Sequence, residues 1–241
     1  MLEEPGGTVN DFWHLHNLDW LSELSDAETA DLQKQSARRD YARAEMVFSP
    51  SVHPDSVYLL EKGLVRIYRL APSGAETTFG FVSPGEIFGE LAAFSDRPRE
   101  SYAQAVRPSV VLQMSRQTMQ RVLAAHPSVG LEITKQIGSR LKRIESRVEN
   151  LVFRDVRWRV ARILLDLAED FGREHGRGVL IDLTLSQEEL ATLVGATRQS
   201  VNASLREFER EGLLTRERRR FVLTRPADLR RTVTEPPAAP G

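Results

Sequence analysis

The sequence predicts an α+β protein with an N-terminal β-roll of the jelly-roll type, one long helix and a C-terminal winged helix-turn-helix domain. Three features predict this fold class: short apolar runs separated by turn residues between positions 41 and 115, a periodic apolar stripe across 128–151, and two short helices followed by two short strands across 186–224. We expect a tail at 1–20, the β-roll at 21–126, the long helix and a hinge at 127–152, the winged domain at 153–226, and a second tail at 227–241.

The β-roll is predicted from the apolar runs VYLL, LVRIYRL, TTFGFV and VVLQM. Turn signals separate them at Glu61-Lys62-Gly63, Pro72-Ser73-Gly74 and Ser83-Pro84-Gly85. Short strands at this spacing are typical of an antiparallel β-roll or sandwich.

The long helix is predicted to begin near Ser128 and to end near Asn150. Apolar residues recur along it at spacings of 4, 4, 3, 4 and 3, namely at Ile133, Ile137, Leu141, Ile144, Val148 and Leu151. This spacing approximates the apolar seam of a two-stranded coiled coil, although such a stripe can equally pack on the β-roll of its own chain. A hinge is expected at 150–155, with Asp155 capping a helix from Val156 to Phe171, and a loop at 172–178.

Two short helices joined by a tight turn are predicted from residue 186 onward. Ser186 with Glu189 forms a capping box, Gly195 permits the positive φ that ends the first helix, and Thr197 caps the second. In the second helix Val201, Leu205 and Phe208 share one face. The polar residues of its first turns are therefore free to contact bases, and the candidate DNA contacts are Thr197, Arg198, Gln199, Ser200 and Asn202.

The wing is predicted from two apolar segments, 213–215 and 221–224, around the basic tip RERRR. Arg218, Arg219 and Arg220 are candidate phosphate contacts, because arginine pairs with phosphate oxygens without reading sequence. The alternative is a helical hairpin with a solvated polar face and a solvated charged loop. Since the net charge is only −1, any electrostatic footprint for DNA must be local.

Two stretches resemble the cyclic AMP receptor protein and FNR (CRP/FNR) family of regulators. The segment ELATLVGATRQSVNASLREFEREGLL with its basic wing is similar to the family's DNA-binding domain. The segment YLLEKGLVRIYRLAPSGAETTFGFVSPGEIFGELAAF is similar to its cyclic-nucleotide-binding domain, with Gly63, Gly74, Gly85 and Gly89 at the turns. The resemblance covers residues 20 to 225.

This resemblance implies a homodimeric transcription regulator rather than an enzyme, with RNA polymerase as a further partner. The dimer would form through the long helix, at Ile137, Leu141, Ile144, Val148 and Leu151. The two recognition helices would then enter successive major grooves about 34 Å apart on a near-palindromic duplex operator. Where the family's familiar half-site is read by an Arg-Glu pair and a second Arg, this chain has Arg198, Gln199 and Ala203, so the preferred bases should differ.

The effector pocket implied by the resemblance departs from the family pattern. Gly89, Glu90, Leu91 and Ser101 match, but a count without gaps puts Glu100 in place of the phosphate-binding Arg. It also puts Ile144 and Glu145 in place of the Thr-Ser pair that contacts adenine. We therefore expect a vestigial pocket, no cofactor and DNA binding independent of cyclic AMP, unless a rearranged loop lets Arg99 replace the missing Arg.

The composition bears on other function classes. The absence of cysteine excludes disulfides, thiol redox sensing and cysteine-ligated iron-sulfur or zinc sites. A haem or other effector-gated sensor is the alternative, with His14, His16 and His53 as candidate ligands. A cupin-type metalloenzyme needs His and Glu ligands on the strands, and residues 57–115 contain no His, so no metal site is predicted. Without a long apolar run or a basic leader, we expect a cytoplasmic protein with no membrane partner.

Overall fold

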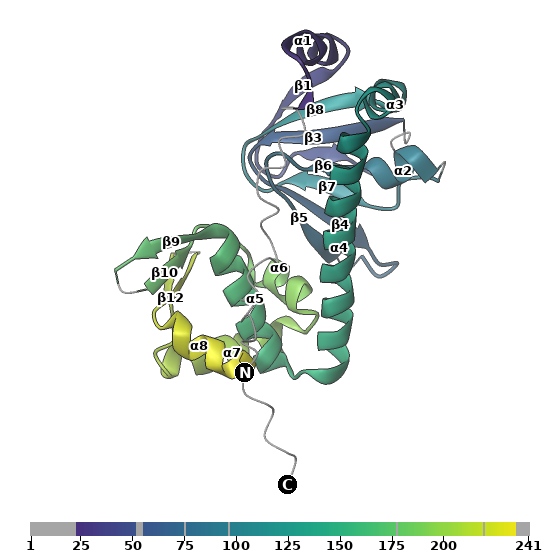
Figure 1. Ribbon diagram of the computed structural model, residues 1–241. Helices are drawn as coiled ribbons and strands as arrows, with labels where there is room; N and C mark the ends of the chain where they lie inside the picture. Colours follow the sequence, from purple (N-terminus) through teal and green to yellow (C-terminus); the bar gives the residue numbers. More distant parts are fainter. Residues whose placement is uncertain are drawn as a thin grey trace, which may run out of the picture. The chain divides into compact units, whose positions relative to one another are not determined.

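The computed structural model describes residues 23–51, 55–74, 76–95, 97–176, 178–218 and 220–234 (Figure 1). The chain divides into two compact units between Ile144 and Glu145, inside the long helix. The first unit contains the β-roll and the second the winged helix-turn-helix domain, so the predicted fold class is confirmed.

Two four-stranded antiparallel sheets form the β-roll. One has the order β1 (Ala37–Tyr41), β8 (Ser109–Ser115), β3 (Ser56–Lys62) and β6 (Ile87–Phe88). The other has the order β2 (Met46–Phe48), β7 (Tyr102–Ala105), β4 (Val65–Leu70) and β5 (Glu76–Val82).

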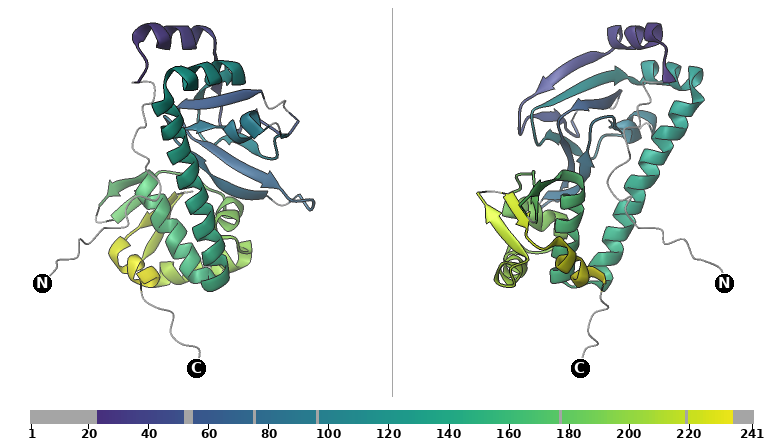
Figure 2. Two further views of the ribbon diagram at one scale, coloured as in Figure 1. Left: turned by 45° about the vertical axis from the view of Figure 1, so that its right-hand side comes forward. Right: turned by 60° about the vertical axis from the view of Figure 1, so that its left-hand side comes forward.

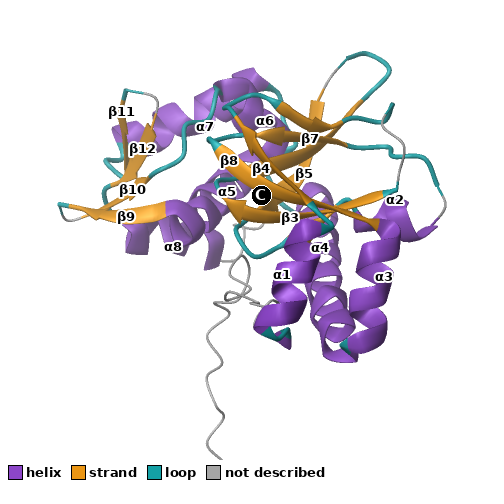
Figure 3. Cartoon of the chain, turned by 90° about the horizontal axis from the view of Figure 1, so that it is seen from above, coloured by secondary structure: helices purple, strands orange, loops and turns teal. Residues whose placement is uncertain are grey.

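The run VYLL of β3 is apolar throughout because both faces of its sheet are covered. Tyr58 and Leu60 point into the core between the two sheets. Val57 and Leu59 pack in a second core with residues of α1 (Asp26–Lys34), α3 (Arg116–Ala125) and α4 (Pro127–Phe153). Figure 3 shows these three helices side by side.

The long helix α4 confirms the predicted helix and settles where its apolar stripe lies. Ile133 is buried in the second core and Ile137 packs against it, so the start of the stripe covers the chain's own β-roll. Figure 2 shows this part of α4 beside the sheets. The later residues remain exposed, with fractions of 54% for Leu141, 36% for Ile144, 56% for Val148 and 49% for Leu151. Because α4 continues to Phe153, the connection to the next helix is shorter than the predicted hinge.

The winged domain begins with α5 (Val156–Phe171), which Asp155 caps as predicted by accepting a hydrogen bond from Trp158 N at 2.7 Å. Its sheet has the order β11 (Leu214–Glu217), β12 (Arg220–Leu223), β10 (Gly178–Ile181) and β9 (Gly172–His175). The helices α6 (Gln187–Val194) and α7 (Arg198–Arg210) form the helix-turn-helix.

Two predictions about this domain are wrong. The segment predicted as a loop contains β9, which pairs antiparallel with β10 (Gly178–Ile181). A Cβ at Gly178 would lie 2.2 Å from Leu223 O, so this glycine marks close strand packing. The expected C-terminal tail begins instead with α8 (Pro226–Thr234), which packs on α5 and buries Leu229 completely. Among the described residues, no helix is long and apolar enough to cross a membrane.

Candidate DNA-binding interface and effector pocket

The four residues that the sequence singles out begin α6, end it and begin α7. Ser186 and Glu189 bond each other's backbone N–H groups at 3.1 and 2.7 Å. Gly195 has a φ of 68°, and a Cβ there would lie 2.6 Å from a methyl group of Leu151. Thr197 accepts a hydrogen bond from Ser200 N at 3.2 Å, which starts α7. The turn thus holds α7 in a defined direction relative to α6.

The two faces of α7 have opposite character. Val201, Leu205 and Phe208 are completely buried against the rest of the domain. Arg198 and Gln199 are exposed in the first turn, as predicted, with the hydroxyl groups of Thr197 and Ser200 2.9 Å apart beside them. The exposed first turn is the part of a recognition helix that reaches base edges.

Asn202 does not fit the expectation that it points freely away from the domain. It is only partly exposed, its Nδ2 donates to Gln187 Oε1 at 3.0 Å, and its Oδ1 is buried without a partner. The same Gln187 oxygen accepts from Arg198 Nε at 3.1 Å. Hydrophobic spacing alone could not reveal this, because Gln187 lies on the other helix.

An arginine of α5 binds the C-terminal part of α7. Arg157 donates to Glu207 at 3.0 Å and to Glu211 at 2.8 and 2.9 Å, and its guanidinium lies 4.5 Å from the Phe208 ring centre. Burial alone would lower the pKa of Arg157, but hydrogen bonds to Glu211 and Glu207 raise it above its ordinary value. This contact was not predicted from the sequence.

An acidic partner engages one of the arginines that the sequence predicts as phosphate contacts of the wing. Arg218 lies at the tip with a φ of 58° and is exposed. Arg219 falls outside the described residues. Arg220 pairs with Asp182 at 2.9 Å, and Asp182 also holds Arg173 at 2.8 Å. Of the predicted phosphate contacts, Arg218 is thus presented at the tip, whereas Arg220 is engaged within the sheet.

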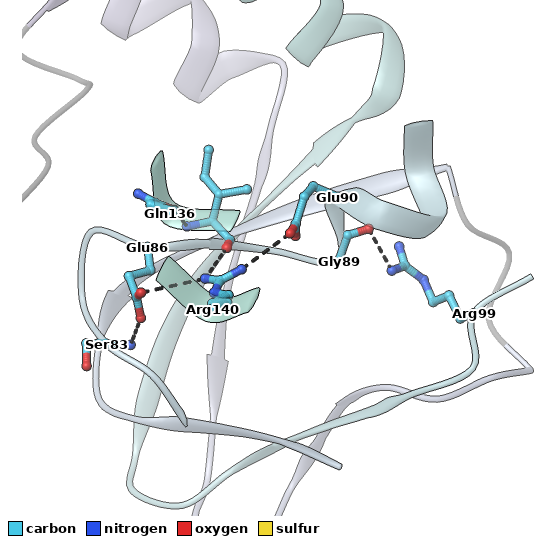
Figure 4. Close-up of polar contacts among 8 residues, drawn as sticks. Ser83, Glu86, Gly89, Glu90, Arg99, Gln136 and Arg140 are labelled. Carbon is cyan, nitrogen blue, oxygen red and sulfur yellow. Dashed lines mark hydrogen bonds and ion pairs between the residues drawn. The ribbon is translucent and has the colours of Figure 1, made fainter. Parts of the chain in front are cut away.

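Glu90 lies in a polar cluster between α2 (Glu90–Ser95) and α4 (Figure 4). It is 5% exposed and pairs with Arg140 at 3.3 Å. Arg140 also donates to Ile87 O at 2.5 Å, while Ile87 N donates to Gln136 at 3.1 Å. Burial raises the pKa of the Glu90 carboxyl above its usual value, although Arg140 opposes the shift.

The placement of Glu100 corrects the predicted pocket. Its carboxylate is 61% exposed and pairs with Arg69 at 2.6 Å, and the same arginine donates to Ser101 Oγ at 3.3 Å. Arg99 occupies the position beside Gly89 instead: it is 4% exposed and donates to Gly89 O at 3.0 Å (Figure 4). This arrangement agrees with the alternative in which Arg99, rather than residue 100, turns inward.

Arg99 is held firmly in this position. Its second terminal nitrogen donates to Ser56 O at 2.5 Å, and its guanidinium lies 4.4 Å from the Phe48 ring centre and 5.3 Å from that of Tyr58. Burial lowers the pKa of this guanidinium from its ordinary value. Of the other residues assigned to the pocket, Leu91 is 67% exposed, and Ile144 and Glu145 are exposed on α4.

No cluster of three or more His, Asp or Glu side chains suited to a metal ion occurs within the described ranges. The candidate haem ligands His14, His16 and His53 lie outside them.

Comparisons with known proteins place this architecture in one family. The cyclic nucleotide-binding domain model matches residues 38–126, and the Crp-like helix-turn-helix domain model matches residues 158–232. The chain is 33% identical to the CRP-like cAMP-activated global transcriptional regulator of Mycobacterium tuberculosis over 81% of this chain and 87% of that protein. It is 29% identical to the global nitrogen regulator of Synechococcus elongatus over 78% of this chain and 86% of that one.

Solved structures agree with these sequence matches. A CooA mutant from Carboxydothermus hydrogenoformans has a TM-score of 0.73 at 27% identity, covering 90% of this chain and 95% of that one. The c-di-GMP responsive regulator CLP of Xanthomonas campestris has a TM-score of 0.74 at 27% identity, covering 83% and 99%. With both domain models and a relative of this similarity matched across most of its length, the chain belongs to the CRP/FNR family of transcription regulators.

Proposed function

We propose that this protein is a homodimeric, sequence-specific DNA-binding regulator of transcription whose DNA binding does not require cyclic AMP. The observation that carries the proposal is α7: its apolar face is completely buried, while Arg198 and Gln199 are exposed in its first turn. Arg198 would bind guanine through O6 and N7, and Gln199 would contact a second base pair. Thr197, Ser200 and the wing arginines Arg218, Arg219 and Arg220 would contact the backbone.

Dimerisation is proposed through the second half of the apolar stripe on α4. Leu141, Ile144, Val148 and Leu151 continue the spacing of the buried Ile133 and Ile137 but are not covered by their own domain. A second copy of the helix would bury them around a two-fold axis. The operator would then be near-palindromic, and RNA polymerase is the expected further partner in the cytoplasm.

The proposed independence from cyclic AMP is supported by the loss of the two contacts to the adenine base. Ile144 and Glu145 stand where the resemblance implies a Thr-Ser pair, and neither side chain reproduces two hydroxyl groups. Glu100 does not support the proposal, since its carboxylate is exposed and pairs with Arg69. A ligand shifts a conformational equilibrium only by its differential affinity for the two states, so a weakly held nucleotide switches little.

A second candidate function is gating by an anionic effector other than cyclic AMP. The buried Arg99 beside Gly89 is the cation that would meet such an anion, provided that its terminal nitrogens exchange Gly89 O and Ser56 O for the ligand. The relatives differ in the effectors that their names state, one being cAMP-activated and another c-di-GMP responsive.

Calorimetry and DNA titrations on the wild-type protein test independence from cyclic AMP, and the titration without any effector also separates the two candidates: operator binding at full affinity favours independence, and absent binding both with and without cyclic AMP favours gating by another effector. We expect no measurable heat with cyclic AMP and the same operator affinity with and without it. Micromolar binding of cyclic AMP, lost in Arg99→Met, together with DNA binding that appears only when the nucleotide is added, would refute independence and establish gating at this pocket.

A further inference from the structure

Gln187 connects the two helices of the helix-turn-helix through one oxygen atom. Its Oε1 accepts hydrogen bonds from Arg198 Nε at 3.1 Å and from Asn202 Nδ2 at 3.0 Å. Arg198 and Asn202 are four residues apart, so they lie on the same face of α7. A carbonyl oxygen has two lone pairs, so these two donors saturate it.

The orientation of both amide groups follows from this geometry. The Nε of Arg198 is only a donor, so the atom of Gln187 that meets it must be the oxygen. The atom of Asn202 that meets the same oxygen must then be its nitrogen, which turns Asn202 Oδ1 inward. That oxygen is buried and has no partner within the described part of the chain.

We propose that Gln187 is a positioning residue that orients the guanidinium of Arg198 for guanine, and that Asn202 supports Gln187 rather than reading a base. The proposal rests on the proposed function of Arg198 and deepens it. We call Gln187, Arg198 and Asn202 the guanine-reading unit.

The state of Arg198 supports the first half of the proposal. With Nε bound to Gln187, the rotation of the guanidinium is restricted while Nη1 and Nη2 have no partner in the described residues. Those two nitrogens form the planar fork that matches O6 and N7 of guanine. Orientation before binding lowers the entropy lost when the side chain is fixed on the base.

The state of Asn202 supports the second half. Bidentate recognition of adenine requires the amide nitrogen to donate to N7 and the amide oxygen to accept from N6. In this structure the nitrogen is bonded to Gln187 and the oxygen is buried. Neither half of the amide is available for adenine.

The experiment measures binding of the full-length dimer to a selected operator and to operators with one base pair changed in each half-site. Gln187→Met keeps the size of the side chain and removes the acceptor. We expect it to lower discrimination at the guanine read by Arg198 about threefold to tenfold, the effect of one net hydrogen bond. Asn202→Ala should lower discrimination at the same guanine, and Gln199→Met, the matched control, should act at a different base pair.

The double variant that combines Gln187→Met with Arg198→Ala provides the decisive comparison. If Gln187 acts through Arg198, Gln187→Met has no further effect on discrimination once Arg198 is removed. An equal loss on all sequences that persists in the Arg198→Ala background would make Gln187 a phosphate contact and overturn the proposal. A loss at an adenine position in Asn202→Ala would overturn the role of Asn202.

Failure of the proposed function is distinguishable from failure of this inference. If Arg198→Ala leaves discrimination unchanged at every guanine, the base-reading role of Arg198 is wrong. If Arg198→Ala has its effect but Gln187→Met and Asn202→Ala do not, only the positioning role is wrong. Thermal unfolding checks each variant, and should Gln187→Met fail to fold, Asn202→Ala tests the same unit from α7.

Discussion

Replacing Leu141 and Val148 together by glutamate should convert the proposed dimer to monomers. Both residues lie on the exposed half of the α4 stripe, with exposed fractions of 54% and 56%. The structure favours this pair over one including Ile137, because Ile137 packs against the core of its own β-roll and its loss would also destabilise the monomer.

The magnitude follows from the exposed fractions. Complete burial of a Leu or Val side chain stabilises by about 1.5–3 kcal/mol. Since roughly half of each side chain remains to be buried, each contributes about 1 kcal/mol to association in each protomer, or about 4 kcal/mol for the dimer. Carboxylates facing each other across the two-fold axis add repulsion. The dimer dissociation constant should therefore rise at least about a thousandfold.

Analytical ultracentrifugation over a concentration series measures this change, and DNA titrations measure its consequence. Leu131→Glu is the matched control: this leucine is 59% exposed on the same helix but points about 80° away from Leu141 around the axis. The control should remain dimeric and bind operator normally. A double variant that still sediments as a dimer at micromolar concentration would place the interface elsewhere and refute the reasoning.

Four further outcomes are expected. Arg198→Ala should weaken operator binding by about 1–3 kcal/mol and relax the preference at one guanine per half-site, whereas a phosphate contact would lose affinity equally on random DNA. Arg218→Ala should reduce the salt dependence of DNA binding by more than Arg220→Ala, which salt titrations measure, because Arg220 already pairs with Asp182. Gly195→Ala should lower the unfolding free energy by about 1–2 kcal/mol in denaturant titrations, because its φ of 68° suits glycine; an unchanged midpoint would contradict this. Hydrogen bonds from Ser25 lower the pKa of Glu28 to about 2. The ionised carboxylate should therefore stabilise α1 fully above about pH 4.5, and this stabilisation should be lost as the pH falls toward 2. Amide exchange in α1 should show this pH dependence, which should be absent in Glu28→Gln.

The elements that the sequence predicted well are those whose signal is local. The capping residues Ser186 and Thr197 and the positive φ of Gly195 act within one turn of chain, so their residue types suffice to place the helices. The predictions failed where contacts between residues distant in the sequence determine the local structure. The β9–β10 hairpin has four exposed residues on β9 and therefore no alternating pattern, and α8 buries only Leu229.

The candidate site shows the same division. Exposure of Arg198 and Gln199 follows from the helical period, because Val201 and Leu205 fix the buried face. The bond from Asn202 to Gln187 crosses between helices, and the inward turn of Arg99 depends on how its loop closes on Ser56. Neither of these contacts can be predicted from the spacing of residues along one sequence.

Selection of binding sites from random duplex DNA by the purified protein, without added nucleotide, tests the central claim most directly. The account predicts enrichment of a two-fold symmetric motif with one fixed guanine in each half-site and half-sites about 34 Å apart, one turn of the double helix. Adding cyclic AMP should change neither the motif nor the yield. Recovery of no motif, or of a motif only when cyclic AMP is present, would contradict the account.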